Sequence, residues 1–395
     1  MNFNTNAQSF TNAGFLRIGS GASVNITGNQ FTNFADDTLT GGRFDVAGTL
    51  RFDNARIVTN ASDLTLRGAH WSILDHAASP QNALRDFSTN LGRFALVDGA
   101  NFTVSSHIDT FRQGGSLAIR AGSTFDFNQA TPTHDADDTS SYWIAGTLKS
   151  PVPIAVAANT TVTLHGRSAQ WQAGGQTLPL QIDAGGRLVF AGGHQAVYQP
   201  GTTVTNHGLI EFGSPETPTF DGGVTRSAGF GQFLNGGFGV GGVTINGPGT
   251  IRIYGGETDD FTSASRTLVN NEPRGLFVSV LTINGGTLDL NGPLIFDRGG
   301  RFDLYGTLTS SLGGGSFNRA YADSAGIFNF HGSIDLNTPL DTTGIQVNYS
   351  PSGFVKLDGV TFTVDNASSS SSLHTVELLN GGGIVDRDGA WALKI

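Results

Sequence analysis

The stretch Gly285–Tyr305, GGTLDLNGPLIFDRGGRFDLY, decides the fold of this chain. It consists of short runs of alternating apolar and polar residues, separated by corners that contain glycine. Leu288 and Leu290 fall on one face of the first run, because successive side chains of a strand point to opposite sides. Phe302 and Leu304 repeat this arrangement at the end of the stretch. The pattern predicts short β-strands, each with one buried face.

The same pattern recurs along most of the chain. Alternating runs flank a short corner in GFLRIGSGASVNIT (14–27), RFDVAGTLRFD (43–53), SLAIRAGSTFDF (116–127) and FNFHGSIDL (328–336). Corners recur every 20-odd residues, as from Gly92 to Gly115 and from Gly186 to Gly208. A repeat of this length is typical of solenoids, in which each coil contacts only its neighbours. We therefore predict an all-β protein in which parallel strands stack as a β-solenoid.

The composition supports an all-β fold and leaves one alternative open. The chain has 56 glycines, which suit tight corners, and 28 phenylalanines, which supply bulk to a core of short strands. No segment keeps an apolar period of 3.6 residues over three turns. Asn-Gly, His-Gly and Ala-Gly corners are also typical of β-hairpins, so an antiparallel sandwich or propeller is the alternative. The solenoid is favoured because the corners vary in length more than tight hairpins allow.

The repeats predict a single β-helix domain over residues 1–395. Two sections depart from the alternating pattern and are predicted to be loop-rich insertions, at about 129–180 and 214–248. The first contains an acidic segment and two nearby prolines, and the second is dense in glycine and phenylalanine.

Charge and cysteine content exclude several functions. The formal net charge is −10 and no Lys/Arg cluster occurs, so binding to nucleic acid is not expected. No apolar run of about 18 residues is present, and no membrane-spanning segment is predicted. The chain has no cysteine, which excludes disulfides and thiolate metal sites. The first residues lack the basic and apolar regions of a signal peptide. Either an export signal has been removed or Met1 begins an intracellular protein, and we expect a fragment whose export signal has been removed.

Three phrases resemble the repeats of a known class of proteins. They are GFLRIGSGASVNITG (14–28), GGRFDVAGTLRFDNARIVTNASDLTLRG (41–68) and LTINGGTLDLNG (281–292). They are similar to the β-strand repeats of large bacterial surface proteins with autotransporter-type passenger domains. The resemblance lies in the rhythm of the repeats and covers most of the chain. It implies a right-handed parallel β-helix that is extracellular or at the cell surface of a bacterium, and it carries over no catalytic residue.

An acidic segment is the candidate metal site. Asp135, Asp137 and Asp138 place three carboxylates within four positions, and such oxygens could bind Ca²⁺. The alternative is a solvated turn in which these side chains form local hydrogen bonds. The full spacing of a calcium loop is absent, and no other cofactor is expected.

Four aromatic residues flank polar loops and are candidates for carbohydrate binding: Trp71, Tyr142, Trp143 and Trp171. Exposed rings of this kind can stack on sugars, whereas buried ones would cap the core. No pattern of residues indicates a nucleophile, a zinc site or a phosphate-binding loop, and no catalytic residue is predicted.

We therefore predict a non-catalytic, extracellular structural or adhesive β-solenoid. Its expected partners are surface glycans or further copies of itself, through end-to-end self-association. One alternative is a polysaccharide lyase or glycoside hydrolase built on a β-helix, which would need converging carboxylates. The other is a segment of a phage fibre.

Overall fold

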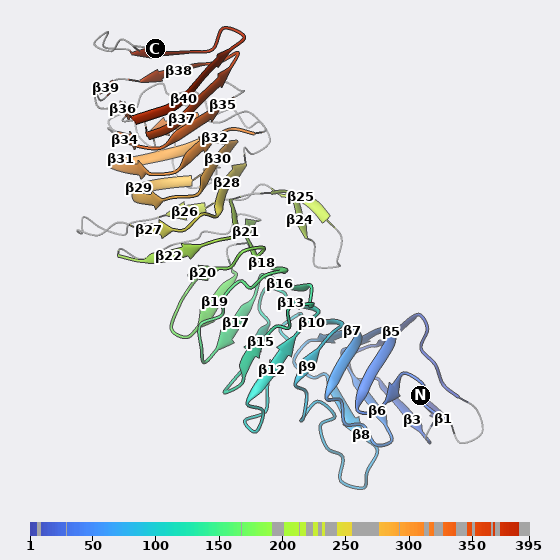
Figure 1. Cartoon of the computed structure of the whole chain (residues 1–395). Helices are drawn as coiled ribbons and strands as arrows, with labels where there is room; N and C mark the ends of the chain where they lie inside the picture. The colour runs from blue at the N-terminus through green and yellow to red at the C-terminus, as the bar shows by residue number, and fades with distance from the viewer. Residues whose placement is uncertain are drawn as a thin grey trace, which may run out of the picture. The chain divides into compact units, whose positions relative to one another are not determined.

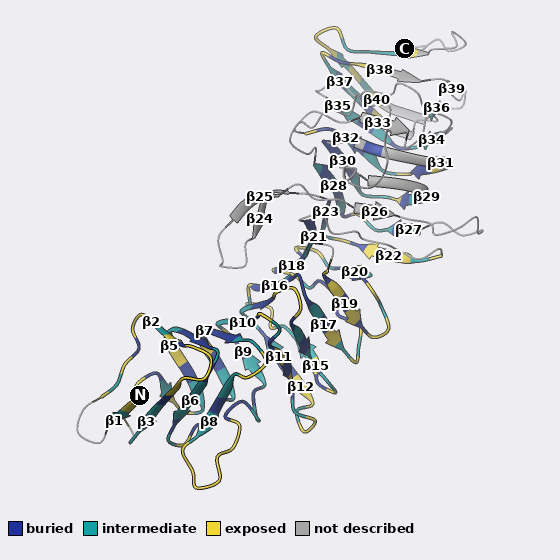
Figure 2. Ribbon diagram, turned by 180° about the vertical axis from the view of Figure 1, so that it is seen from behind, coloured by how far each residue is buried: buried dark blue, intermediate teal, exposed yellow. Residues whose placement is uncertain are grey.

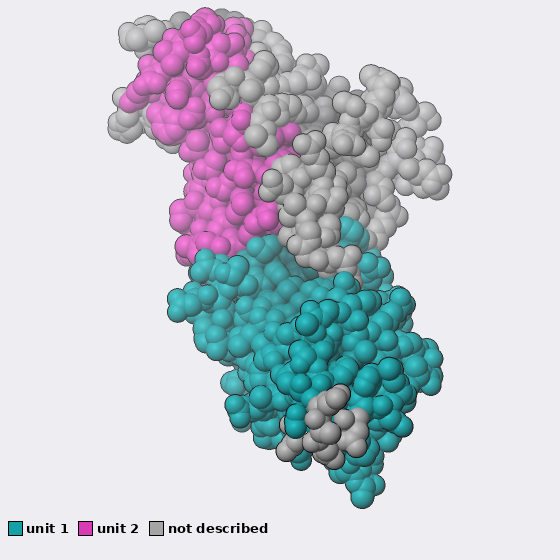
Figure 3. Space-filling view, turned by 90° about the vertical axis from the view of Figure 1, so that its right-hand side faces the viewer, with its two compact units in different colours: residues 1–179, 218–223 teal, residues 180–217, 224–395 magenta. Residues whose placement is uncertain are grey.

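The computed structural model describes residues 1–5, 9–28, 30–166, 168–191, 201–212, 214–218, 224–227, 231–233, 243–254, 276–291, 293–311, 316–319, 327–336, 346–349, 352–364, 366–367 and 372–386. The chain forms two compact units (Figure 3). Unit 1 contains residues 1–179 and 218–223, and unit 2 contains residues 180–217 and 224–395.

Across these described ranges the chain forms strands and no helix (Figure 1). The ladders that join successive coils are parallel, so the fold is a β-solenoid, which confirms the predicted fold class. The alternative of an antiparallel sandwich or propeller is wrong, because each segment runs in the same direction as the segment one coil away. No helix in this part of the chain is long and apolar enough to cross a membrane.

Unit 1 is built on a central ladder of parallel strands. In chain order these are β2 (Phe15–Ile18), β5 (Thr38–Val46), β7 (Thr59–Arg67), β10 (Arg93–Val97), β13 (Ser116–Ile119), β16 (Ser140–Ile144) and β18 (Thr160–His165). Leu64, Phe94 and Leu117 are in register on three successive strands, and all three are buried. The register therefore stacks apolar side chains coil over coil, as alternation of apolar and polar residues predicts.

Further ladders complete the coils of unit 1. One contains β1 (Asn2–Asn4), β3 (Ser23–Thr27), β6 (Thr49–Phe52) and β8 (Ser72–Asp75), and another contains β11 (Asn101–Thr103), β14 (Thr124–Asp126), β17 (Thr147–Ser150) and β19 (Gln170–Ala173). Three short strands pair with one another in a row: β9 (Thr89–Asn90), β12 (Thr110–Gln113) and β15 (Thr131–Thr133). Along the chain, each comes directly before a strand of the central ladder. A local hairpin joins β4 (Phe34–Ala35) to β5 in the antiparallel sense.

Unit 2 has two main ladders. The first contains β21 (Arg187–Ala191), β23 (Leu209–Phe212), β28 (Thr250–Tyr254), β30 (Thr287–Asn291), β32 (Thr307–Thr309), β35 (Ser333–Leu336), β37 (Ser352–Asp358) and β40 (Ser372–Leu379). The second contains β20 (Gln181–Ile182), β22 (Thr203–Asn206), β27 (Val243–Asn246), β29 (Leu276–Asn284), β31 (Pro293–Leu304), β34 (Ile327–Phe330), β36 (Gln346–Tyr349) and β39 (Asn366–Ala367).

Six further short strands stand outside the main order of these two ladders. β26 (Gly231–Phe233) pairs with β29, and β33 (Ser316–Arg319) pairs with β31. β38 (Thr361–Val364) pairs with β41 (Gly383–Asp386), and β24 (Ser214–Pro218) forms a two-stranded sheet with β25 (Val224–Ser227).

The stretch that decides the fold differs in one detail from its prediction. The segment 297–300, expected to form a corner, lies inside β31. Phe296 pairs with Val278 and Arg301 pairs with Val280, so the extra residues form a bulge against β29. A bulge inserts unpaired residues into one strand without ending it, and the alternating pattern alone does not distinguish it from a corner.

The core of each unit consists of buried apolar side chains from successive coils. Figure 2 marks the buried residues along the strands in dark blue. In unit 1, Phe94, Phe102 and Phe125 pack against one another with ring centroids 5.3–6.0 Å apart. In unit 2, Phe302 and Phe328 stack at 5.1 Å across adjacent coils. Burial of these rings and of the aliphatic side chains beside them is the main favourable contribution to the stability of the coils.

Glycine at the corners allows successive coils to approach closely. A Cβ added to Gly306 would lie 2.5 Å from the carbonyl oxygen of Gly286. The same oxygen accepts a hydrogen bond from the amide of Thr307, with an N–O distance of 2.9 Å. Gly249 and Gly208 repeat the arrangement two corners earlier. Any larger residue at these positions would push the ladder apart.

Buried amide side chains line another corner of unit 1. Asn60 donates to the side-chain oxygen of Asn90 at 2.9 Å, and Asn90 donates to that of Gln113 at 3.1 Å. Asn60 also donates to the carbonyl oxygen of Arg93, and Asn90 to that of Ser116. This amide column satisfies polar groups inside the coil and ties each corner to the next one.

Residues 129–180, predicted as a loop-rich insertion, contain β15 to β19, which extend the ladders of unit 1. The alternating pattern is interrupted here because polar side chains point inward: Ser140 and Thr160 are buried and hydrogen-bonded to each other at 2.7 Å. Much of the second predicted insertion, 214–248, lies outside the described residues. The prediction of a single domain stays a prediction.

Candidate functional site

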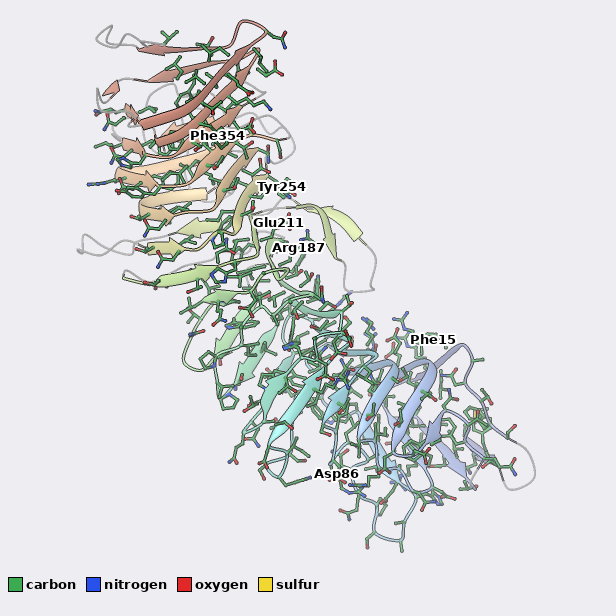
Figure 4. The ribbon with its side chains drawn as sticks, in the orientation of Figure 1. Phe15, Asp86, Arg187, Glu211, Tyr254 and Phe354 are labelled. Carbon is green, nitrogen blue, oxygen red and sulfur yellow. The ribbon has the colours of Figure 1, made fainter. Side chains whose placement is uncertain are left out.

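The outer face of the first ladder of unit 2 carries a column of charged side chains. Glu211, Arg252 and Asp289 are in direct register on β23, β28 and β30. Each follows an inward-pointing residue, such as Ile251 before Arg252 and Leu288 before Asp289, so alternation turns the charged residues outward. Figure 4 shows Glu211 and Tyr254 close together on this part of the solenoid. We call this set the charged column.

Glu211 is held by groups from the strands on both sides. Arg187 donates its Nε–H to Glu211 Oε2, and Tyr254 donates its hydroxyl to Oε1 at 2.9 Å. Arg252 places a guanidinium nitrogen 3.9 Å from the same carboxylate. The Glu211 side chain is only 2% exposed, so these contacts replace the water that an ionised carboxylate would otherwise require.

Asp289 is held in a similar way. Arg252 donates its Nε–H to Oδ2 at 2.6 Å, and Ser311 donates its backbone N–H and its hydroxyl at 2.9 and 2.7 Å. Burial alone would raise the pKa of Asp289, but the hydrogen bonds from Ser311 and Arg252 outweigh it and lower that pKa. Burial and the neighbouring Glu211 carboxylate raise the pKa of the Tyr254 hydroxyl.

The lowered pKa of Asp289 makes this side chain a fixed anion at neutral pH. A general acid must carry a proton at the working pH, which requires a raised carboxyl pKa. Asp289 has the opposite shift, and its oxygens already accept bonds from Arg252 and Ser311. This chemistry suits the joining of adjacent coils by ion pairs better than it suits proton transfer.

The predicted calcium ligands contact an arginine. Arg112 donates two hydrogen bonds to Asp138, at 3.1 and 2.8 Å, and lies 2.9 Å from Asp135. The hydrogen bond from Arg112 is the main reason that the pKa of Asp138 is lowered. Asp137 is exposed. Where residues are described, no group of three or more His, Cys, Asp or Glu side chains could hold a metal ion. Calcium binding stays a prediction, and Ca²⁺ would have to displace Arg112.

Two of the four candidate sugar-binding aromatics lie in the core. Tyr142 is 1% exposed and Trp171 is 2% exposed, so neither ring can stack on a sugar in this structure. The Tyr142 hydroxyl is within hydrogen-bonding distance, 2.9 Å, of Nε2 of His134. Burial lowers the pKa of His134, against the opposing effect of Asp138. Sequence position next to a polar loop did not distinguish these core residues from exposed ones.

The other two aromatics are half-buried. Trp143 stacks on His165 with ring centroids 4.9 Å apart, and it packs against the outward-facing Ala118. Trp71 lies 6.4 Å from the ring of Phe102. Thus the structure does not bring the four predicted residues into one surface, and it leaves carbohydrate binding by Trp71 and Trp143 as a prediction.

The charged column was not identified from the sequence, although a signal for it exists. The phrases TIRIY (250–254) and TLDLN (287–291) carry Arg252 and Asp289 at the same position of equivalent runs. Aligning the repeats strand by strand would have placed these opposite charges on neighbouring coils. Comparison with protein-family models, with curated proteins and with solved structures finds no match to this chain.

Proposed function

We propose that this chain is a non-catalytic structural or adhesive β-solenoid of a bacterial surface or extracellular matrix. The observation that carries the proposal is the charged column, in which the most buried carboxylates among the described residues of unit 2 are engaged by arginines of adjacent coils. Charges used in this way hold the solenoid together. The resemblance of the repeats to autotransporter-type passenger domains supports the same type of protein and the same location.

Unit 1 uses its outward charges similarly. Arg67 bonds to both oxygens of Asp45 at 3.0 Å and also to Asp98, which belongs to the next coil along the chain. Arg93 bonds to Asp63 at 2.8 Å across the same ladder. Partly exposed pairs of this kind contribute little singly, but each one favours the correct register between coils.

The remaining outer surface suits weak and repeated contacts. Threonine, serine and asparagine dominate the outward positions of short strands such as SVNIT (23–27) and TVTN (203–206). A hydrated surface that repeats at each coil presents many equivalent groups to a glycan or to another copy of the chain. Multiple weak contacts then produce a stable attachment without a deep binding site.

A polysaccharide lyase or glycoside hydrolase is the second candidate. It is favoured by the presence of two buried carboxylates, Glu211 and Asp289, on one outer face with Arg252 between them. They are two coils apart, or about 10 Å along the ladder. This strand spacing is just above the separation of about 6.5–9.5 Å between the two carboxyl groups of inverting glycosidases.

An activity screen distinguishes the two candidates. The purified chain is incubated with uronate-containing and neutral polysaccharides, and released reducing ends and unsaturated uronates are measured. We expect no product. Product formation that disappears in Glu211→Gln and Asp289→Asn variants with unchanged circular dichroism would overturn the proposal and establish the enzyme. For the location, antibody labelling should detect the protein on intact bacteria that produce it, and labelling only after permeabilisation would contradict it.

A further inference from the structure

A second column of outward side chains lies at a corner of unit 2. Thr205, Asn246 and Asn284 are in register on β22, β27 and β29. The column continues with Tyr305 and His331, which directly follow the paired residues Leu304 and Phe330 of β31 and β34. We call these five residues the corner column. Each one comes next to a buried apolar residue and therefore points away from the core.

The corner column is ordered by contacts along its length. Asn284 donates from its side-chain amide to the Oδ1 of Asn246 at 3.0 Å. The rings of Tyr305 and His331 stack at 4.5 Å with an angle of 9° between their planes. The backbone beneath them is fixed, because Tyr305 donates its N–H to Ile283 and His331 to Leu304, both at 2.9 Å.

This ordered column is open to solvent. Tyr305 is 50% exposed, and Thr205 and Asn284 are exposed as well. The hydrogen bond between the two side-chain amides uses one of the two N–H groups of Asn284 and one lone pair of Asn246 Oδ1. Each amide therefore keeps further hydrogen-bonding capacity. The column thus presents an aromatic ring beside two oriented amides.

A parallel row of hydroxyl groups lies beside it. Thr203, Thr244 and Thr282 are in register two residues before Thr205, Asn246 and Asn284 on the same strands. The two rows are about 7 Å apart along each strand, and their members repeat about every 4.8 Å from coil to coil. The threonine row continues with Asp303 of β31, which is in register with Thr282, is 7% exposed and accepts a hydrogen bond from Arg301 at 2.9 Å. Together the two rows form a regular surface of hydroxyl, amide and aromatic groups that also carries this Asp303–Arg301 ion pair.

The chemistry of this surface matches a neutral sugar chain. An aromatic ring packs on the apolar face of a sugar, while side-chain amides and hydroxyls exchange hydrogen bonds with its hydroxyl groups. A phosphate or uronate polymer would instead favour arginines or lysines that are not already neutralised, whereas Arg301 is paired with the carboxylate of Asp303 at 2.9 Å. We propose that the corner column, with the threonine row beside it, binds a neutral polysaccharide, with one sugar ring packed on the side of Tyr305 that is not stacked on His331. This rests on the proposed adhesive function and names its ligand class.

The test uses the whole chain and neutral polysaccharides as probes. Binding to cellulose, chitin, β-1,3-glucan and soluble mannan is measured by pull-down and affinity electrophoresis, with polygalacturonate as the anionic comparison. Binding to at least one neutral polymer is expected. Tyr305→Ala should weaken it about tenfold, Tyr305→Phe should retain most of it because the ring remains, and Asn284→Ala should weaken it several-fold. Phe354→Ala removes another exposed aromatic of unit 2, 38% exposed, and should change nothing.

The outcomes separate this inference from the function on which it rests. Binding that is unaffected by Tyr305→Ala, or equally weakened by Phe354→Ala, overturns the assignment of the surface and leaves an adhesive protein. Binding to none of the neutral polymers, or only to polygalacturonate, overturns the ligand class. Cleavage of a polymer would overturn the proposed non-catalytic function instead.

Discussion

At the level of single residues, the corners show why this chain needs so much glycine. The backbone of one coil lies against the backbone of the next at Gly306 and Gly286, with no room for a methyl group. Glycine is required at position 306 because the two coils pack closely there. At Gly285 the backbone also has a positive φ of 87°, which glycine adopts without strain.

Gly306→Ala tests the packing at a corner. Its Cβ would meet the carbonyl oxygen of Gly286 at 2.5 Å, so the two coils must shift and the bond from Thr307 must lengthen. We expect a loss of about 1–3 kcal/mol in the free energy of unfolding. Gly383→Ala is the control, because a Cβ there meets nothing within 4 Å. Equal stability of the two variants in urea unfolding would refute the packing argument.

Asp289 predicts a pH dependence of stability. Its folded pKa is lowered, so its contribution is fully present above the unfolded value of about 3.9 and declines as the pH falls from that value through the folded pKa. Asp289→Asn should therefore cost about 1–3 kcal/mol at neutral pH and less at about pH 3. Urea unfolding at both pH values measures this, with the exposed Asp137→Asn as control. A deficit that is the same at both pH values would contradict the assignment.

At the level of elements, polar columns complement the apolar core. The Asn60–Asn90–Gln113 column shows that the interior of a coil is not uniformly apolar: each amide replaces hydrogen bonds that backbone groups lose at the corner. The strand runs themselves were predictable, because alternation is a local property. The inward polar positions and the bulge in β31 were not, because they depend on which residue lies one coil away.

Asn90→Ala tests the amide column. The change removes bonds to Asn60, Gln113 and Ser116 and leaves buried polar groups without partners. We expect a loss of about 2–3 kcal/mol, since each orphaned buried group costs about 1–3 kcal/mol. Asn101→Ala, at an exposed position of β11, should stay within about 0.5 kcal/mol of the parent chain. The unfolding midpoints of the two variants measure these losses. A small loss of stability in Asn90→Ala would contradict a stabilising role of the amide column.

At the level of the whole molecule, each coil is stabilised mainly by its neighbours. The ladders pair each strand with the strand one coil earlier and one coil later, so a local defect should spread only a short distance. The proposed adhesive function follows from the same property, because a repeating framework presents equivalent outer groups at regular intervals.

Hydrogen exchange measures how far a defect spreads. In Asn90→Ala, amides of β7 and β13 should lose protection, because they pair directly with β10 in the affected coil. Amides of β18, three strands farther along the ladder, should keep theirs. A uniform loss of protection throughout unit 1 would show that the unit unfolds as one cooperative block, contrary to this expectation.

The sequence by itself determined that the chain is an all-β solenoid, because strand alternation and glycine corners depend on neighbours along the chain. Only the tertiary structure decided which side chains meet across coils. It placed Tyr142 and Trp171 in the core, joined Asp138 to Arg112, and brought Glu211, Arg252 and Asp289 into register. These contacts join residues roughly 20 to 40 positions apart. Which residue meets which across two coils depends on the length of the loop between the strands. The local alternation of apolar and polar residues carries no information about that length.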